Sequence, residues 1–316
     1  MKIVVLESLD VSEDELREIA KPVTDQGHEL VLYEKTDDIE LQKKHVKDAN
    51  ILVIGNMPLK GEVIRVAENL KYIAVAFTGV DHVDLDACKE KCIQVSNAAG
   101  YATVNVAELV IGLMLALLRD IVPLNKAIRK GEKASDLGQE LGSKTVGIIG
   151  TGAIGAKLAE LVLAFGCDVL AYGRTEKEDL KKKGVKYLPL DDLLKQSDIV
   201  SIHFPLLEST KGLINKERLE MMKPTAFLIN TARGPIVDND ALAEALKEGK
   251  IAGAGIDVFD MEPPIPEDYP LLNAPNIILT PHIGFFTKEA MIRRVHITFD
   301  ENIAKWLAGD QQNVVL

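Results

Sequence analysis

Cysteine and aromatic residues are scarce in this chain of 316 residues, which has three cysteines and 5% aromatic residues. The cysteines (Cys88, Cys92 and Cys167) form no disulfide framework, and their odd number is typical of a protein in a reducing compartment. Cys88 and Cys92 lie four residues apart, but no matching His or Cys pair stands nearby. We therefore expect neither disulfides nor a metal site.

Basic residues are too few to balance the acidic ones. The 37 Lys and Arg and the 48 Asp and Glu give a formal net charge of −11, which argues against a surface for nucleic acid or an anionic membrane. The opening residues, MKIVVLESLD, do not have the pattern of a secretory signal peptide. An apolar stretch at 106–118 is interrupted by Glu108 and is too short to cross a membrane. The sequence therefore predicts a cytoplasmic protein with neither nucleic acid nor a membrane as a partner.

Short apolar segments alternate with helical patterns over the first 99 residues. The expected strands lie at 2–6, 29–33, 50–54, 71–76 and 93–95. Such alternation predicts a parallel sheet, so we expect a small doubly wound domain here. The loop after the fourth of these strands contains Thr78 and Gly79. Its backbone N–H groups are suited to an anion, although a simple turn explains the loop equally well.

A second alternating region runs from 100 to 285 and opens with a long apolar helix expected at 103–119. The expected strands follow at 146–149, 168–172, 199–201, 226–229, 253–258 and 277–279. Residues 288–307 have the apolar spacing of a helix that fits neither sheet, so we expect them to return to the first domain. The predicted domains are therefore residues 1–99 with 286–316, and residues 100–285.

Three glycines stand between a strand and a helix of the second region. Gly150, Gly152 and Gly155 have the spacing G-x-G-x-x-G within KTVGIIGTGAIG, and a helical pattern follows at 156–165. In this setting the first glycine permits a tight turn, the second lets the backbone approach a pyrophosphate, and the third allows helix and strand to pack closely. The N-terminus of the helix favours the negative charge of the phosphates. The stretch predicts a dinucleotide site, with an ordinary turn as the alternative.

Arg233, Glu262 and His282 follow three later strands of the same region. Because ligands of an open parallel sheet bind outside the carboxyl ends of its strands, we expect these side chains at the edge that carries the glycine loop. Arginine matches a carboxylate, histidine exchanges protons near neutral pH, and a glutamate can fix the histidine tautomer. Taken singly, a surface arginine, an exposed loop acid and a capping histidine are the alternatives. His203 follows another strand and is expected near the cofactor.

The order of the motifs resembles that of one known family. Over roughly residues 70–290 the chain is similar to the D-isomer-specific 2-hydroxyacid dehydrogenases, in the stretches AFTGVDHVDLDAC, NAAGYATVNVAELVIGLMLALLR, TVGIIGTGAIG, DIVSIHFPLLESTKGLI, FLINTARGPIVDNDAL, AGAGIDVFDMEPP and ILTPHIGFFT. The resemblance implies an α/β fold of two doubly wound parallel-sheet domains, a flavodoxin-like substrate domain and a Rossmann nucleotide-binding domain. It also implies a homodimer formed through the nucleotide-binding domain.

The resemblance further implies a reaction and a role for each site residue. A hydride passes between the nicotinamide and C2 of a small 2-oxo or D-2-hydroxy acid, of the glyoxylate, hydroxypyruvate or branched 2-oxo acid type. Arg233 binds the substrate carboxylate and carbonyl, His282 exchanges a proton with the C2 oxygen, and Glu262 is the family's acid before the double proline. The amides of Thr78 and Gly79 hold the carboxylate. The dinucleotide is lined by the three glycines and by Ala153, Ile154, Thr231 and Asp257.

Two features depart from the family pattern. In NAD-binding units an acidic residue at the end of the second strand usually binds the ribose 2′-hydroxyl. Here that strand is expected at 168–172, and it is followed by Gly173, Arg174 and Thr175. Because no carboxylate repels a 2′-phosphate and Arg174 can pair with it, we expect NADP(H) as the cofactor, with NAD(H) as the alternative. The segment 131–142 is short and lacks the tryptophan that the family often carries there, which leaves the size of the substrate open.

Two other functions fit the same fold. Corepressor-like relatives bind a dinucleotide as non-catalytic scaffolds and can keep the same three polar residues, and other relatives act on phosphite or formate. The lack of long disordered tails in this sequence favours the enzyme. Turnover of 2-oxo acids with NADPH or NADH distinguishes the oxidoreductase from the scaffold.

Overall fold

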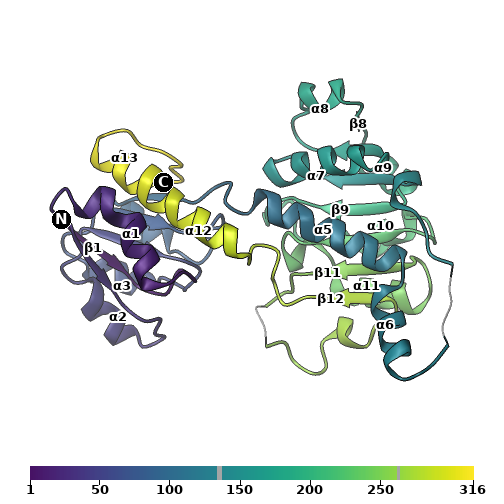
Figure 1. The fold of residues 1–316 in the computed structure, drawn as a ribbon, viewed down its shortest axis with the longest axis horizontal. Coiled ribbons are helices and arrows are strands. Elements are labelled where there is room, and N and C mark those ends of the chain that lie inside the picture. The colour runs from purple at the N-terminus through teal and green to yellow at the C-terminus, as the bar shows by residue number, and fades with distance from the viewer. Residues whose placement is uncertain (134–136, 262–263) are drawn as a thin grey trace. The chain divides into compact units, whose positions relative to one another are not determined.

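The computed structural model describes residues 1–133, 137–261 and 264–316. The described chain divides into two compact units, Met1–Ala102 with Thr287–Leu316 and Thr103–Phe286. In Figure 1 the first unit contains the purple N-terminal and the yellow C-terminal elements, and the second contains the teal and green ones. Each unit is built around its own parallel sheet.

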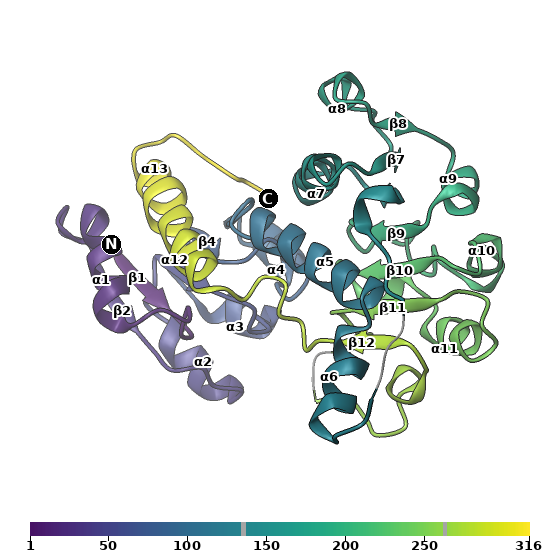
Figure 2. The same ribbon diagram turned by 45° about the vertical axis from the view of Figure 1, so that its right-hand side comes forward.

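The first unit has a five-stranded sheet with the order β2-β1-β3-β4-β5. Its elements are β1 (Lys2–Val5), α1 (Glu13–Thr24), β2 (Glu29–Leu32), α2 (Ile39–Val46), β3 (Ile51–Ile54), α3 (Gly61–Val66), β4 (Tyr72–Val75), α4 (Leu85–Glu90), β5 (Gln94–Asn97) and, at the C-terminal end, α12 (Lys288–His296) and α13 (Ala304–Leu307). The C-terminal helices and α1 cover one face of the sheet, with Leu16 and Phe299 in that core layer. Helices α2, α3 and α4 cover the other face, with Val46 and Val63 in its core (Figure 2).

The C-terminal helix expected at 288–307 is interrupted by a π-helical segment, Ile297–Ile303, between α12 and α13. Within this segment the Thr298 hydroxyl donates a hydrogen bond of 2.7 Å to the carbonyl of Arg294, which competes with the regular helical ladder. The guanidinium of Arg294 is itself buried and pairs with Asp10 at 2.7 Å. Both contacts involve Arg294, three residues before the irregular segment begins.

The second unit has a seven-stranded sheet with the order β12-β11-β10-β9-β6-β7-β8. Its elements are α5 (Thr103–Leu118), α6 (Ile121–Arg129), η1 (Leu141–Ser143), β6 (Thr145–Ile149), α7 (Ala153–Ala164), β7 (Asp168–Tyr172), α8 (Glu178–Lys182), β8 (Lys186–Tyr187), α9 (Leu190–Gln196), β9 (Ile199–Ile202), α10 (Lys216–Met221), β10 (Phe227–Asn230), η2 (Gly234–Ile236), α11 (Asn239–Lys247), β11 (Gly253–Ile256), η3 (Pro270–Asn273) and β12 (Ile277–Leu279). Helices α5 and α7 cover one face, and α9, α10 and α11 cover the other.

The order of strands in the second unit reverses between β6 and β9. From β6 the chain runs outward to β7 and β8, and from β9 it runs outward on the other side to β12. All neighbouring strands pair in parallel, so their carboxyl ends lie at one edge. Ligands of such sheets bind beside the point of reversal. The predicted α/β fold with two doubly wound parallel sheets is confirmed.

Candidate active site

The glycine loop lies directly after β6, at the point where the strand order reverses. Gly150 has φ +100°, a left-handed conformation that favours glycine. A Cβ at Gly155 would overlap the carbonyl oxygen of Gly150, so only glycine lets α7 start this close to the strand. Gly152, in contrast, is the N-cap of α7 and faces open space, and it has no side chain to cap the helix. The first-turn amides of α7, which include Ala153 and Ile154, therefore point to a space suited to a phosphate.

The loop after β7 carries the residues expected to select the cofactor. A Cβ at Gly173 would lie 3.4 Å from the hydroxyl of Thr151, so this loop is packed against the glycine loop. Arg174 and Thr175 are both exposed. The nearby Glu176 is ion-paired with Lys181. The end of β7 thus offers a cationic side chain and no carboxylate at the position where NAD-binding units usually have one.

Arg233 follows β10 in a loop that the buried Asn230 holds. The Asn230 amide donates to the Arg233 carbonyl at 3.0 Å and accepts from the Ala232 N–H at 3.0 Å. The Arg233 guanidinium donates to the Ala232 carbonyl at 2.7 Å. A Cβ at Gly234 would overlap the carbonyl of Phe259, so the loops after β10 and β11 are in direct contact.

The hydroxyl oxygen of Thr231, in the same loop, is buried and has no hydrogen-bond partner among the described residues. A buried polar atom of this kind usually has a partner. The Thr231 hydroxyl and the open space next to Gly152 both fit a dinucleotide that binds along this edge.

His282 follows β12 and is held by the backbone and side chain of Asp257, which follows β11. The His282 N–H donates to the Asp257 carbonyl at 2.8 Å, and His282 has φ +53°. The Asp257 carboxylate accepts from the Thr280 hydroxyl at 2.5 Å, from the Ile283 N–H at 2.9 Å and from the Gly284 N–H at 2.8 Å. Burial raises the pKa of Asp257, and these three hydrogen bonds oppose that rise. Asp257 therefore shapes the whole loop around His282.

His203 follows β9, beside the glycine loop. Its N–H donates to the Ile149 carbonyl at 2.7 Å, and a Cβ at Gly150 would come within 2.9 Å of the His203 carbonyl. The ring Nε2 lies 2.8 Å from the Ser201 hydroxyl. Burial lowers the pKa of His203 to about 4, so the imidazole is neutral at physiological pH.

The other predicted residues fall outside this edge or outside the described residues. Glu262 lies outside the described residues. Thr78 and Gly79 belong to the first unit, in the loop directly after β4, where the Asn97 amide donates to the Thr78 carbonyl at 2.8 Å. Over the described ranges, no group of His, Cys, Asp and Glu side chains could hold a metal ion, and no helix is long and apolar enough to cross a membrane.

Sequence reasoning missed the side chains that support the site. Asp257 was expected to line the dinucleotide, but the structure shows that it also holds the loop of His282. Asn230 supports Arg233, and an Asn at a strand end before a turn is a recognisable signal for such a role. Tyr187 donates to Thr151 of the glycine loop at 3.0 Å, and no local pattern in the sequence indicates that contact.

Comparison with known proteins agrees with this geometry. The model of the D-isomer specific 2-hydroxyacid dehydrogenase family, NAD binding domain, matches residues 111–284. A hydroxypyruvate reductase of Thermotoga maritima is 42% identical over 269 residues, which cover 84% of this chain and 87% of that protein. The structure of an acyclic imino acid reductase in complex with NADPH and D-Arg has a TM-score of 0.88 and 29% identity, with 100% of both chains covered. For a D-lactate dehydrogenase from Aquifex aeolicus complexed with NAD and lactic acid, the TM-score is 0.84 and the identity 32%, with 98% of this chain and 96% of that one covered.

The fold and the matched residues define a dinucleotide-dependent oxidoreductase. The chain belongs to the D-isomer specific 2-hydroxyacid dehydrogenase family, as its motifs predict. It is an NAD(P)-dependent enzyme that acts on the CH–OH group of small D-2-hydroxy acids or on the corresponding 2-oxo acids.

Proposed function

We propose that the chain reduces a small 2-oxo acid to the D-2-hydroxy acid, with NADPH preferred over NADH. The observation that supports this proposal is the position of four loops at one edge of the seven-stranded sheet. The loops after β10, β11 and β12, which carry Arg233, Asp257 and His282, share that edge with the glycine loop after β6. The hydroxypyruvate reductase and the lactate dehydrogenase among the similar proteins support a small substrate with a carboxylate next to the reacting carbon.

Each site residue has a distinct task in this proposal. When bound, the nicotinamide supplies the hydride that reaches substrate C2. Arg233 binds the substrate carboxylate and the C2 oxygen through its planar guanidinium. His282 donates a proton to the C2 oxygen, and Glu262 stabilises the protonated imidazole. The amides of Thr78 and Gly79 bind the carboxylate. The domain of residues 1–99 with 286–316 binds the substrate, and the domain of residues 100–285 binds the dinucleotide.

The preference for NADPH rests on the end of β7. Gly173 replaces the usual acid, and Arg174 is exposed beside Thr175. A guanidinium pairs well with a phosphate, and the lack of a carboxylate removes the repulsion that excludes a 2′-phosphate from NAD-specific sites. NADH remains the alternative, since the similar solved structures contain NADPH in one case and NAD in another.

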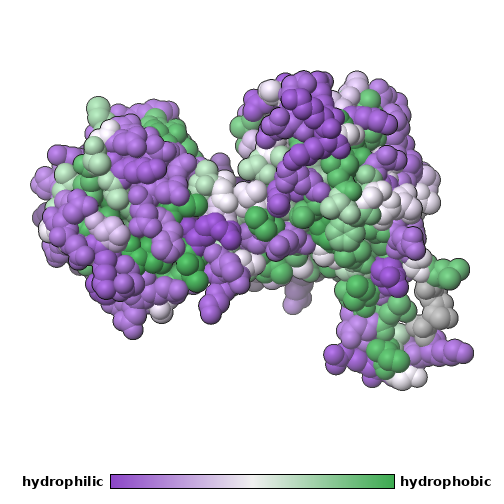
Figure 3. Space-filling view, turned by 45° about the horizontal axis from the view of Figure 1, so that its top comes forward, coloured by the Kyte–Doolittle hydropathy of each residue, from purple (hydrophilic) through white to green (hydrophobic). Residues whose placement is uncertain are grey.

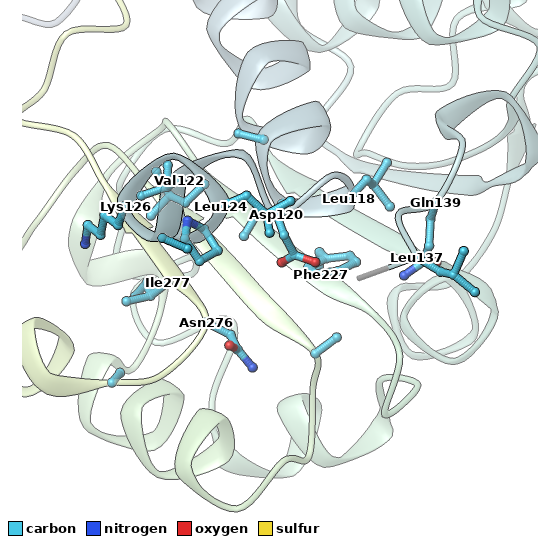
Figure 4. Close-up of a pocket in the computed structure, with 17 residues that line it drawn as sticks. Leu118, Asp120, Val122, Leu124, Lys126, Leu137, Gln139, Phe227, Asn276 and Ile277 are labelled. Carbon is cyan, nitrogen blue, oxygen red and sulfur yellow. The ribbon is translucent and has the colours of Figure 1, made fainter. Parts of the chain in front are cut away.

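We also propose a cytoplasmic homodimer formed through the second unit. Helix α6 has no buried residue, and its Ile121 and Ile128 are 52% and 72% exposed. A hollow of about 640 Å³ lies beside it, between α6 and the edge strand β12, and Leu124 and Ile277 contribute to its lining (Figure 4). Figure 3 shows hydrophobic (green) side chains among hydrophilic (purple) ones at this end of the unit, toward the lower right. A second copy would cover these apolar side chains, as large exposed patches usually mark an interface.

The oligomeric state is tested with one variant and one control. Ile128→Asp places a charge in the proposed interface and should convert the dimer into a monomer in sedimentation equilibrium. Leu41→Asp places the same charge on exposed α2 of the first unit and should leave the dimer intact. A wild-type chain that sediments as a monomer would contradict the proposal.

The reaction is tested by following the absorbance of NADPH and NADH with a panel of 2-oxo acids. We expect turnover with both cofactors and a kcat/KM at least about tenfold higher with NADPH. His282→Ala should lower kcat by roughly 10²–10⁴-fold and leave the Kd of NADPH unchanged. A wild-type chain that binds the dinucleotide but turns over no 2-oxo acid would favour the scaffold function instead.

A further inference from the structure

The loop that carries Arg174 is fastened to the glycine loop by a single hydroxyl group. Tyr187, in the short edge strand β8, donates a hydrogen bond of 3.0 Å to the hydroxyl of Thr151. The same Tyr187 oxygen accepts a hydrogen bond of 3.1 Å from the N–H of Lys177. Thr151 stands between the first two glycines of the fingerprint, and Lys177 ends the loop that starts at Gly173. One phenol therefore joins the glycine loop to the loop that carries Arg174.

The bridge acts on a loop with exposed side chains. Residues 173–177 connect the core strand β7 to α8 and expose the side chains of Arg174 and Thr175. Thr151 is only 6% exposed, so its hydroxyl is a fixed anchor. At the far side, Lys181 lies 6.0 Å from the centre of the Tyr187 ring and is ion-paired with Glu176 and Glu178.

The acidic residues near Arg174 are balanced by basic ones. Lys181 is ion-paired with both Glu176 and Glu178 and offsets one of their two negative charges. Over residues 173–181, three basic side chains (Arg174, Lys177 and Lys181) match three acidic ones. Arg174 has no ion pair with any of the described residues. An arginine on a loose loop must lose much of its freedom when it binds a phosphate, and a loop that is already fastened reduces that loss.

We propose that Tyr187 is a positioning residue that sets coenzyme selectivity, because its hydroxyl bridge holds the Arg174 loop ready for a 2′-phosphate. The inference rests on the proposed preference for NADPH. The pyrophosphate site at Gly150, Gly152 and α7 does not depend on the bridge, since the backbone of the glycine loop is fixed by its own strand and helix. Loss of the bridge therefore weakens the binding of 2′-phosphorylated nucleotides selectively.

Tyr187→Phe tests the bridge, since it removes the hydroxyl and keeps the ring. The Kd values of NADPH, NADH, 2′,5′-ADP and 5′-AMP are measured by calorimetry, so the result does not depend on activity. We expect the Kd of NADPH and of 2′,5′-ADP to rise about tenfold, and those of NADH and 5′-AMP to change less than about twofold. Tyr33→Phe, in the first unit, is the matched control and should change none of the four.

A second variant tests whether the hydroxyls of Tyr187 and Thr151 act through the same hydrogen bond. Thr151→Val removes the acceptor of the bridge. If the two hydroxyls act through one hydrogen bond, the double variant Tyr187→Phe with Thr151→Val should lose no more selectivity than the single variant with the larger loss. Equal weakening of all four ligands in Tyr187→Phe would show a general structural role and overturn the inference, as would four unchanged values. A wild-type chain that binds 5′-AMP as tightly as 2′,5′-ADP would instead reject the NADPH preference itself, and the inference with it.

Discussion

The carboxylate of Asp257 accepts the backbone N–H of Gly284 at 2.8 Å, across two neighbouring strand ends. A Cβ at Gly284 would lie 2.9 Å from the same oxygen, so the contact requires glycine at this position. His282 lies two residues before Gly284 and donates its own N–H to the Asp257 backbone. The proposed proton donor is therefore placed by a buried acid that follows a different strand.

Replacement of Asp257 by Asn is expected to displace the loop of His282. An amide has one acceptor oxygen, so its NH2 group would face an N–H or a hydroxyl donor at a buried site, at a cost of about 1–3 kcal/mol in the free energy of unfolding. We expect kcat/KM to fall by roughly 10²-fold, because small errors of placement are costly in catalysis. Urea unfolding and steady-state kinetics measure the two effects.

Thr280→Val is the matched control for this prediction, because it removes only one of the donors to Asp257. It should lower stability by about 1 kcal/mol and reduce kcat/KM less than Asp257→Asn does. If Asp257→Asn keeps the wild-type kcat/KM, the carboxylate has no role in placing His282.

The glycines of the fingerprint allow binding and folding to be separated. Gly152→Ala adds a methyl group that would have no described residue within 4 Å apart from its neighbours along the chain, so the fold should tolerate it. The same methyl group would occupy the space expected for the pyrophosphate, and the Kd of NADPH should rise at least about tenfold. Gly155→Ala would drive its methyl group into the Gly150 carbonyl, so it should lower the melting temperature. Thermal unfolding and calorimetry test the pair, and a Gly152→Ala chain that binds NADPH normally would show that the pyrophosphate binds elsewhere.

Local sequence patterns were sufficient for the fold. Alternating apolar segments and helices indicate two parallel sheets, and the glycines mark the strand at which the order reverses. The rule that ligands bind at the carboxyl ends of strands then brings Arg233 and His282 to that edge. The fold prediction succeeds because it depends on residues close together in the chain, and the structure places Arg233 after β10 and His282 after β12, as the topology rule predicts.

The supporting contacts could not be predicted in the same way. Tyr187 and Thr151 are 36 residues apart, and Asp257 and Gly284 are 27 apart. Each pair depends on the register of neighbouring strands and on the length of the loops between them. The strand expected at 253–258 in fact ends at Ile256, which turns Asp257 from a strand residue into the first residue of the loop. A shift of this size at the end of a strand decides what a side chain can reach.

Acid should destabilise the protein partly through His203. Burial lowers its pKa from 6.5 to about 4, so the unfolded chain binds the proton more tightly than the folded one. Its contribution to stability is therefore complete above pH 6.5 and is lost as the pH falls toward about 4. Because part of the side chain is exposed, we expect a loss of about 1–2 kcal/mol.

His203→Gln isolates this contribution, because glutamine does not titrate. Urea unfolding of both proteins at pH 7.5 and at pH 5 gives the difference in unfolding free energy at each pH. The wild type should lose more stability than the variant on acidification. A difference that stays constant between the two pH values would show that His203 has the same pKa in the folded and unfolded states.

Glu7 is a buried acid of the first unit that is 4% exposed. Its Oε1 accepts the N–H of Gly55 at 2.7 Å and the N–H of Met57 at 2.8 Å, so it holds the loop after β3. Glu7→Ala leaves both N–H groups without this acceptor and should lower the free energy of unfolding by about 2–3 kcal/mol. Glu7→Gln keeps an oxygen acceptor and should cost about 1 kcal/mol or less. Urea unfolding distinguishes the variants, and equal losses for both would mean that the charge of Glu7, rather than its oxygen, holds the loop.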